Sequence, residues 1–171
     1  MNILAIESSC DETAAAVVKD GTTILSSVIA SSSAMHEKYG GIVPEVASRE
    51  QLRCMLPTIQ EALEEAHLIY DSIDAIAVTI GPGLIGSLLI GVETAKTIAY
   101  VTKKPIIPVN HVLAHLYANF LVPNQSISFP AIGLVVSGGH TELFLMNSVR
   151  KLKWLGGTID DAAGEAFDKT A

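Results

Sequence analysis

Residues 2–30, NILAIESSCDETAAAVVKDGTTILSSVIA, are the stretch that decides the fold. Residues 2–7 and 13–19 are rich in aliphatic side chains and have the length of buried strands. Asp20-Gly21 is a strong hairpin-turn signal, and residues 23–30 continue as a third apolar run. The chain is therefore predicted to begin with an antiparallel meander of three strands.

A helix is predicted to follow this meander. Residues 44–67 have helical periodicity, and Pro57 inside them should kink the helix or divide it. The predicted buried face consists of aliphatic residues at spacings of four, three and four: Leu52, Leu56, Ile59 and Leu63.

Two strand–helix pairs come next in the predicted order. Short apolar strands are expected at residues 75–80 and 106–109. One helix should begin at Ser87, and another should run from Asn110, its N-cap, to Phe120. Strands that alternate with helices form right-handed parallel crossovers. We therefore predict an α/β fold with a mixed five-stranded sheet and flanking helices.

A polar, proline-flanked linker at residues 123–130 is predicted to precede a second domain. Strands are expected at 131–136 and 142–146, which repeat the strand–turn–strand pattern of the start. Residues 160–171 begin like a helix and stop without a cap. We therefore predict a first domain at residues 1–125 and the start of an incomplete second domain at 126–171, as part of a longer protein.

The composition favours a soluble, cytoplasmic protein. The longest uncharged runs contain glycines or polar residues that interrupt the roughly 20 apolar residues of a membrane-spanning helix, and Glu7 comes too early for a signal peptide. Two cysteines without a paired spacing indicate a reducing compartment. The net charge of −7 disfavours binding to polyphosphate unless basic residues cluster or a partner supplies them.

His111 and His115 are the strongest candidate for a metal site. Their four-residue spacing on a predicted helix puts both imidazoles on one face, directly after a strand end, where α/β proteins place their sites. The alternative is two polar residues on an amphipathic helix. Val112 stands where a His-Glu-x-x-His zinc protease has its glutamate base. The pair therefore favours a metal that orients a substrate or acts as a Lewis acid, and it requires a third ligand.

Residues 135–141, VVSGGHT, are the second candidate site. Two glycines let the backbone approach a ligand and turn its N–H groups toward an anion. The alternative is an ordinary hairpin turn.

Two acidic stretches are weaker candidates. Residues 7–13, ESSCDET, are either a site for phosphate or magnesium or a solvated hairpin. Asp161, Glu165 and Asp168 share a predicted helix face, which is usually solvated surface, although one carboxylate there could accept hydrogen bonds from a ribose hydroxyl.

Together these motifs resemble those of the bacterial tRNA N6-adenosine threonylcarbamoyltransferase family (TsaD), once described as O-sialoglycoprotein endopeptidases. The resemblance extends over essentially the whole chain. It is carried by the His111/His115 pair and by five runs: IESSCDET (6–13), YGGIVPE (39–45), GPGL (81–84), VSGGHT (136–141) and IDDAAGEAFDK (159–169).

The resemblance implies an actin-like ATPase (ASKHA) fold of two related domains, the second of them truncated here. It implies that His111 and His115 bind one iron or zinc ion, and ATP with Mg²⁺ is a second candidate cofactor. It assigns no catalytic residue. It implies that the substrate is threonylcarbamoyl-adenylate. The residues that the resemblance assigns to binding it lie in one turn and one predicted helix: Val135, Val136, Ser137, Gly138, Gly139 and Asp168.

The same resemblance implies transfer of the threonylcarbamoyl group to N6 of the adenosine beside the anticodon, in tRNAs that read codons beginning with A. It implies two protein partners, a non-catalytic paralogue of the TsaB type and a small ATPase of the TsaE type, and no membrane. The family has a further metal-binding aspartate in its C-terminal portion, so we expect this chain alone to bind metal weakly and to be inactive. Two rival functions are a metalloprotease, disfavoured by Val112, and a scaffold subunit that pairs through the helix at 44–67.

Overall fold

The computed structural model describes residues 1–122 and 126–171. By their contacts these residues divide into two compact units, Met1–His111 and Val112–Ala171, which we call the first and the second unit and describe separately. The predicted linker at 123–130 lies partly outside the described residues. The predicted domain division between residues 125 and 126 therefore stays a prediction.

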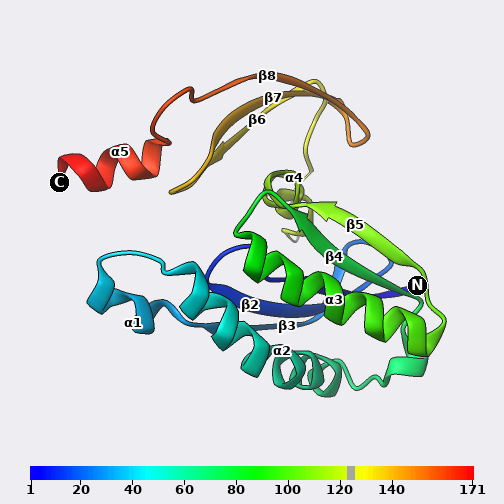
Figure 1. Cartoon of the computed structure of the whole chain (residues 1–171). Coiled ribbons are helices and arrows are strands. Elements are labelled where there is room, and N and C mark those ends of the chain that lie inside the picture. The colour runs from blue at the N-terminus through cyan, green and yellow to red at the C-terminus, as the bar shows by residue number, and fades with distance from the viewer. Residues whose placement is uncertain (123–125) are drawn as a thin grey trace. The chain divides into compact units, whose positions relative to one another are not determined.

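The first unit contains the mixed five-stranded sheet that the sequence predicts, with strand order β3-β2-β1-β4-β5 (Figure 1). β1 pairs with β2 in antiparallel and with β4 in parallel orientation, and β4 pairs in parallel with β5. Asp20 and Gly21 adopt the positive φ angles of a tight turn, 53° and 81°. The strands are β1 (Asn2–Glu7), β2 (Glu12–Lys19), β3 (Thr23–Ser31), β4 (Ala75–Gly81) and β5 (Ile106–Asn110).

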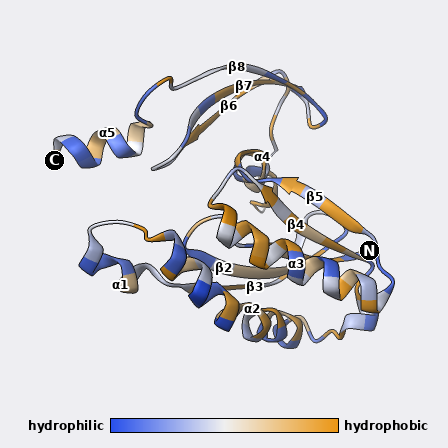
Figure 2. Cartoon of the chain, viewed as in Figure 1, coloured by the Kyte–Doolittle hydropathy of each residue, from blue (hydrophilic) through white to orange (hydrophobic). Residues whose placement is uncertain are grey.

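Two long helices pack against this sheet, α2 (Pro44–Glu65) on β2 and β3, and α3 (Ile85–Thr102) on β4. Short helical turns complete the connections: α1 (Ser33–His36), η1 (Glu37–Tyr39) and η2 (Tyr70–Ser72). The helices meet the sheet in a core in which Leu4 and Ile76 are fully buried, together with Met55 and Ile59 of α2. Hydrophobic residues are visible along β4, β5 and the first turns of α3 in Figure 2.

One prediction about α2 is wrong, and another is wrong in one of its two forms. Pro57 does not divide the helix, which continues through it to Glu65, and the predicted kink stays a prediction. The predicted face is displaced, because Leu52 and Leu56 are 67% and 61% exposed. The true buried face is rotated by about one residue and includes small and polar side chains, which a search for apolar spacings does not detect. The buried residues of α2 are Ala47, Gln51, Met55, Thr58, Ile59, Ala62 and Leu63.

The second unit contains a three-stranded antiparallel sheet of order β6-β7-β8. Its apolar core joins Val112 and Leu116 of α4 to Val135, Phe144 and Met146 of the sheet. The elements that follow β5 along the chain are α4 (His111–Tyr117), η3 (Ala118–Leu121), β6 (Ala131–Val136), β7 (Thr141–Ser148), β8 (Lys151–Gly157) and α5 (Ala163–Thr170).

Three details of this region differ from the predictions. The helix expected to reach Phe120 is α-helical only to Tyr117 and then continues as a 3-10 turn. β8 was not predicted, because lysines interrupt its apolar pattern. The helix expected to begin at residue 160 is α5, which begins three residues later, at Ala163. In the described part of the chain, no helix has the length and apolar character needed to cross a membrane.

Candidate functional site

α4 carries both candidate metal ligands. β5 ends at Asn110 and α4 begins at His111, so His111 and His115 lie one helical turn apart immediately after a strand. Val112 and Leu116 turn into the apolar core of the second unit, whereas the His111 side chain is 21% exposed and His115 is exposed. Neither imidazole is enclosed in apolar core. Among the residues that the structure describes, no cluster of three or more His, Cys, Asp or Glu side chains forms a metal site.

Two residues of the first unit hold the Nδ1 atom of His111. The Ser9 hydroxyl lies 3.0 Å from Nδ1 and the Glu7 carboxylate lies 3.4 Å from it. An imidazole that donates its Nδ1–H to a carboxylate presents Nε2 as the metal-binding atom, which is the usual arrangement around metal-bound histidines. The structure thus adds Glu7 and Ser9 to the site as residues that orient a candidate ligand.

Glu7 is ionised at neutral pH. Burial by itself would raise its pKa, but hydrogen bonds with His111, Ser9 and Thr79 outweigh burial and lower the pKa from 4.5 to about 2. Thr79 donates its hydroxyl to Glu7 over 2.5 Å, and the Ser9 backbone N–H donates to the same carboxylate. A charged carboxylate is therefore fixed beside the imidazole.

The turn between β1 and β2 contains Cys10, which is not an activated nucleophile. Burial and the neighbouring carboxylate of Asp11 raise the pKa of the Cys10 thiol. A thiol with a raised pKa is protonated at neutral pH and reacts poorly.

Hydrogen bonds close the Ser137-Gly138-Gly139 turn, and the space beside its two glycines is open. The Ser137 N–H donates to the His140 carbonyl over 2.8 Å, and the His140 N–H donates to the Ser137 hydroxyl over 3.0 Å. A Cβ atom added at Gly138 or Gly139 would meet nothing within 4 Å. The space beside both glycines is therefore open to a ligand.

The first turn of α5 packs directly against this hairpin. The Gly164 N–H donates to the Ser137 carbonyl over 3.2 Å, and the Ala163 N–H donates to the Thr141 hydroxyl over 2.8 Å. Asp168 is exposed and follows Gly164 by one helical turn, so it lies on the same side of α5. The second unit thus places the hairpin at the N-terminus of the helix that carries Asp168.

The remaining acids of the predicted helix face have a structural partner. Lys169 lies 2.8 Å from Asp161 and 3.0 Å from Glu165. These hydrogen bonds raise the pKa of Lys169, with the Asp161 bond the largest cause. Both carboxylates therefore belong to a surface ion-pair network.

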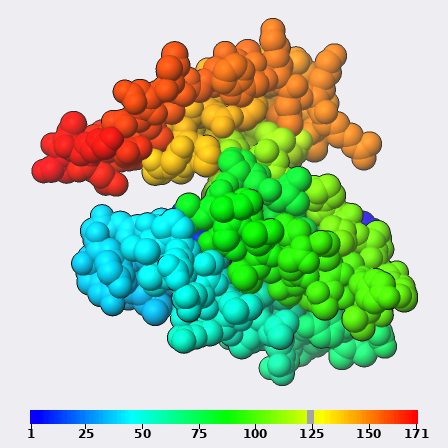
Figure 3. Space-filling view, viewed as in Figure 1, coloured from blue at the N-terminus to red at the C-terminus, as the bar shows by residue number. Residues whose placement is uncertain are grey.

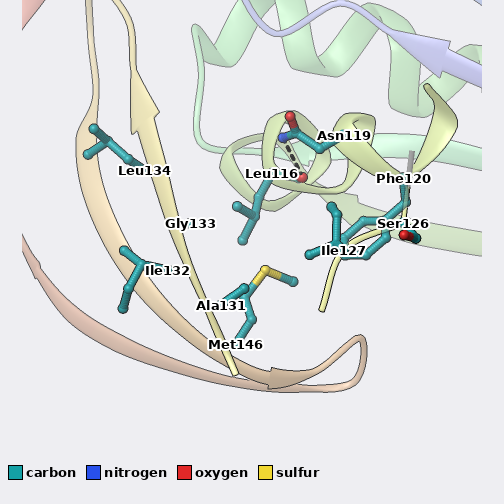
Figure 4. Close-up of a pocket in the computed structure, with 10 residues that line it drawn as sticks. All are labelled: Leu116, Asn119, Phe120, Ser126, Ile127, Ala131, Ile132, Gly133, Leu134 and Met146. Atoms are coloured by element: carbon teal, nitrogen blue, oxygen red, sulfur yellow. Dashed lines mark hydrogen bonds between the residues drawn. The ribbon is translucent and has the colours of Figure 1, made fainter. Parts of the chain in front are cut away.

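A pocket of about 400 Å³ lies elsewhere in the second unit (Figure 4). Leu116 of α4 and Met146 of β7 contribute to it, and the Asn119 side chain donates to the Leu116 carbonyl over 3.0 Å beside it. No predicted ligand-binding residue lines this pocket, so it is not the candidate site.

Comparison with known proteins assigns the family. The family model described as tRNA N6-adenosine threonylcarbamoyltransferase matches residues 23–171. This chain belongs to the tRNA N6-adenosine threonylcarbamoyltransferase family. The curated transferases of Syntrophomonas wolfei and Thermomicrobium roseum are each 56% identical to it, over 99% and 100% of the chain. These matches cover 50% and 48% of the two relatives, so the chain spans about half their length.

Solved structures confirm the predicted actin-like ATPase fold. YeaZ from Pseudomonas aeruginosa superimposes with a TM-score of 0.57 at 14% identity, over 91% of this chain and 66% of that one. A second structure, described as a protein with similarity to peptidase YeaZ from the same organism, gives a TM-score of 0.56 at 15% identity over 91% of this chain and 63% of that chain. At such identities the likeness concerns the fold.

Proposed function

We propose that the protein containing this chain transfers the threonylcarbamoyl group from threonylcarbamoyl-adenylate to N6 of the adenosine beside the anticodon, in tRNAs that read codons beginning with A, in the cytoplasm. The observation that carries the proposal is the 56% identity over 99% of the chain to a curated transferase of this name. No observation favours a metalloprotease, and Val112 stands where such an enzyme has its base.

His111 and His115 would bind one iron or zinc ion, because neutral imidazole suits both metals. The support is that Ser9 and Glu7 lie 3.0 and 3.4 Å from Nδ1 of His111, as outer-shell partners orient metal-binding imidazoles, and that His115 is exposed one turn away. When bound, the metal would supply Lewis-acid polarisation of the threonylcarbamoyl carbonyl. The remaining ligand would come from outside this chain.

The substrate would lie against the Ser137-Gly138-Gly139 turn, with Val135 and Val136 leading into it. Backbone N–H groups at Gly138 and Gly139 would stabilise negative charge as the adenine amine attacks and AMP leaves. Asp168 would bind the substrate through its carboxylate. It lies one helical turn beyond Gly164, whose N–H donates to the Ser137 carbonyl. The polar β1–β2 turn, residues 8–11, is the candidate site for ATP with Mg²⁺.

A partner of the non-catalytic paralogue type would bind the outer side of α2 and α3, and a small ATPase would complete the assembly. The two helices adjoin (Figure 3), and a Cβ at Gly86 would lie 3.4 Å from Ser48. Beyond this contact they expose large apolar side chains: Leu52, Leu56, Ile85 and Leu89. Large apolar side chains exposed close together are typical of protein interfaces. tRNA contact shared with such partners would reconcile the acidic charge with RNA binding.

The test is a threonylcarbamoyl-transfer assay on the full-length protein, with metal content measured in parallel. His111→Ala and His115→Ala should each lose metal and transfer. The control is His67→Asn, which replaces a histidine outside the pair. Asparagine is chosen because His67 has a φ of 54°, a left-handed conformation that asparagine tolerates. Retained metal in both alanine variants would exclude the pair as ligands, and transfer at undiminished rates would exclude their role in the reaction.

A further inference from the structure

The β1–β2 turn is held by its carbonyl groups. From Ser8 to Glu12, five successive carbonyl oxygens accept hydrogen bonds from side chains or backbone of other segments. The Leu84 N–H donates to the Ser9 carbonyl over 2.7 Å, and the Ser32 hydroxyl donates to the Asp11 carbonyl over 2.6 Å. The other three carbonyls, at Ser8, Cys10 and Glu12, accept from one atom, the amide nitrogen of Gln51.

Gln51 is buried in the middle of this arrangement, at 1% exposure on α2. Its amide nitrogen lies 2.9 Å from the Cys10 carbonyl, 3.1 Å from the Glu12 carbonyl and 3.4 Å from the Ser8 carbonyl. An amide has two N–H hydrogens, so the two shorter bonds are the principal ones. The opposite amide orientation would place an oxygen against three carbonyl oxygens, and the acceptors therefore fix the orientation.

The Gln51 carbonyl oxygen supports a role for this orientation. Among the residues that the structure describes, Gln51 Oε1 is buried and has no hydrogen-bond partner. A buried polar atom without a partner is destabilising, and an apolar side chain at this position would avoid that cost. We attribute the presence of Gln51 to its N–H donors, which bind the carbonyls of the β1–β2 turn as an apolar side chain could not.

The turn bound by Gln51 places Ser9 beside His111, next to Glu7 at the end of β1. Ser9 lies between Ser8 and Cys10, two of the three residues whose carbonyls Gln51 binds. On its other side Ser9 contacts Gly83, where a Cβ atom would overlap the Ser9 carbonyl. Fixed from both sides, Ser9 places its hydroxyl 3.0 Å from His111 Nδ1 and its N–H on Glu7.

We infer that Gln51 is a positioning residue for His111: its amide sets the conformation of the β1–β2 turn, and the turn holds Ser9 and Glu7 against Nδ1. This inference rests on the proposed function in so far as His111 is a metal ligand. Gln51 itself touches neither metal nor substrate.

The first test is NMR on the unaltered 171-residue chain. Through-hydrogen-bond couplings from the Gln51 side-chain nitrogen to the Cys10 and Glu12 carbonyl carbons should be detected. Their absence, with both signals assigned, would overturn the inference without any variant.

The second test compares Gln51→Met with Gln60→Met. Both change the same residue type on α2, but Gln60 is exposed and donates to the neighbouring Glu64 side chain over 2.9 Å. Gln51→Met should shift the His111 ring-nitrogen signals in the same direction as Ser9→Ala and weaken Zn²⁺ binding by about tenfold, the lower end of the effect of removing outer-shell partners. Gln60→Met should do neither.

A double variant separates positioning from general loosening. If Gln51 acts through Ser9, then adding Gln51→Met to Ser9→Ala should not weaken zinc binding further, whereas independent effects would add. Additive effects, or a folded Gln51→Met chain with unchanged His111 signals, would refute the inference. Zinc binding is measured on the full-length protein, because the remaining ligand is proposed to lie outside this chain. Failure of the full-length wild type to bind zinc would count against the metal proposal alone, because the His111 signals still decide the role of Gln51.

Discussion

Replacing Glu7 with glutamine should remove a pH-dependent part of the stability of the first unit. The folded-state pKa of Glu7 is about 2, against 4.5 in the unfolded chain. Because the folded pKa is the lower one, this stability is fully present above pH 4.5 and is lost as the pH falls toward 2. At about 1.36 kcal/mol per pKa unit the shift corresponds to about 3.4 kcal/mol. The Glu7 side chain is 34% exposed, so solvent screening reduces the expected contribution to about 1–2 kcal/mol.

The assay is urea unfolding at pH 7, 4 and 2.5, followed by the NMR amide signals of β1 and β4. The single tryptophan, Trp154, lies in β8 of the second unit, so its fluorescence would report on the wrong part of the chain. Wild type should lose about 1–2 kcal/mol more than Glu7→Gln between pH 7 and pH 2.5. Glu61→Gln, which removes an exposed carboxylate of α2, is the control and should keep the wild-type pH dependence. Equal pH dependence in Glu7→Gln and wild type would refute the role assigned to the Glu7 hydrogen bonds.

Three further predictions concern the packing of the two units and the proposed partner surface. Gly164→Ala would put a Cβ 2.7 Å from the Ser137 carbonyl and should destabilise the second unit by about 1–3 kcal/mol in urea unfolding followed by Trp154 fluorescence; Gly156→Ala, with nothing within 4 Å, is the control. Met55→Ala, at a site 2% exposed, should cost about 2–5 kcal/mol in the same NMR-detected unfolding, whereas Leu52→Ala, at 67% exposure, should change it by less than about 0.5 kcal/mol. Leu52→Lys should leave the melting temperature unchanged but reduce copurification of the full-length protein with its paralogue partner; undiminished copurification would place the interface elsewhere.

The strands of the first unit could be predicted from sequence because they are short apolar runs bounded by turn signals. Asp20-Gly21 fixes the first hairpin, and the register from Ile3 opposite Val18 to Glu7 opposite Ala14 follows from it. The buried face of α2 could not be predicted in the same way. Gln51 is buried because it satisfies backbone carbonyls of a distant turn, and Leu52 is exposed beside it. Apolar periodicity contains no information about such a partner.

The two histidines could be named as candidate ligands from their spacing. The residues that contact His111 could not be named in this way, because 102 and 104 positions separate it from Ser9 and Glu7. The sheet topology supplies the missing link. β1, β4 and β5 are parallel neighbours, so their carboxyl ends meet at one edge. Glu7 ends β1, Thr79 lies two residues before the end of β4, and His111 directly follows β5. Side chains at adjacent carboxyl ends of parallel strands are where α/β proteins assemble sites. The predicted order of strands and helices already implied that β4 and β5 are parallel neighbours. What the sequence did not supply was that β1 pairs with β4, and this pairing brings Glu7, Thr79 and His111 together.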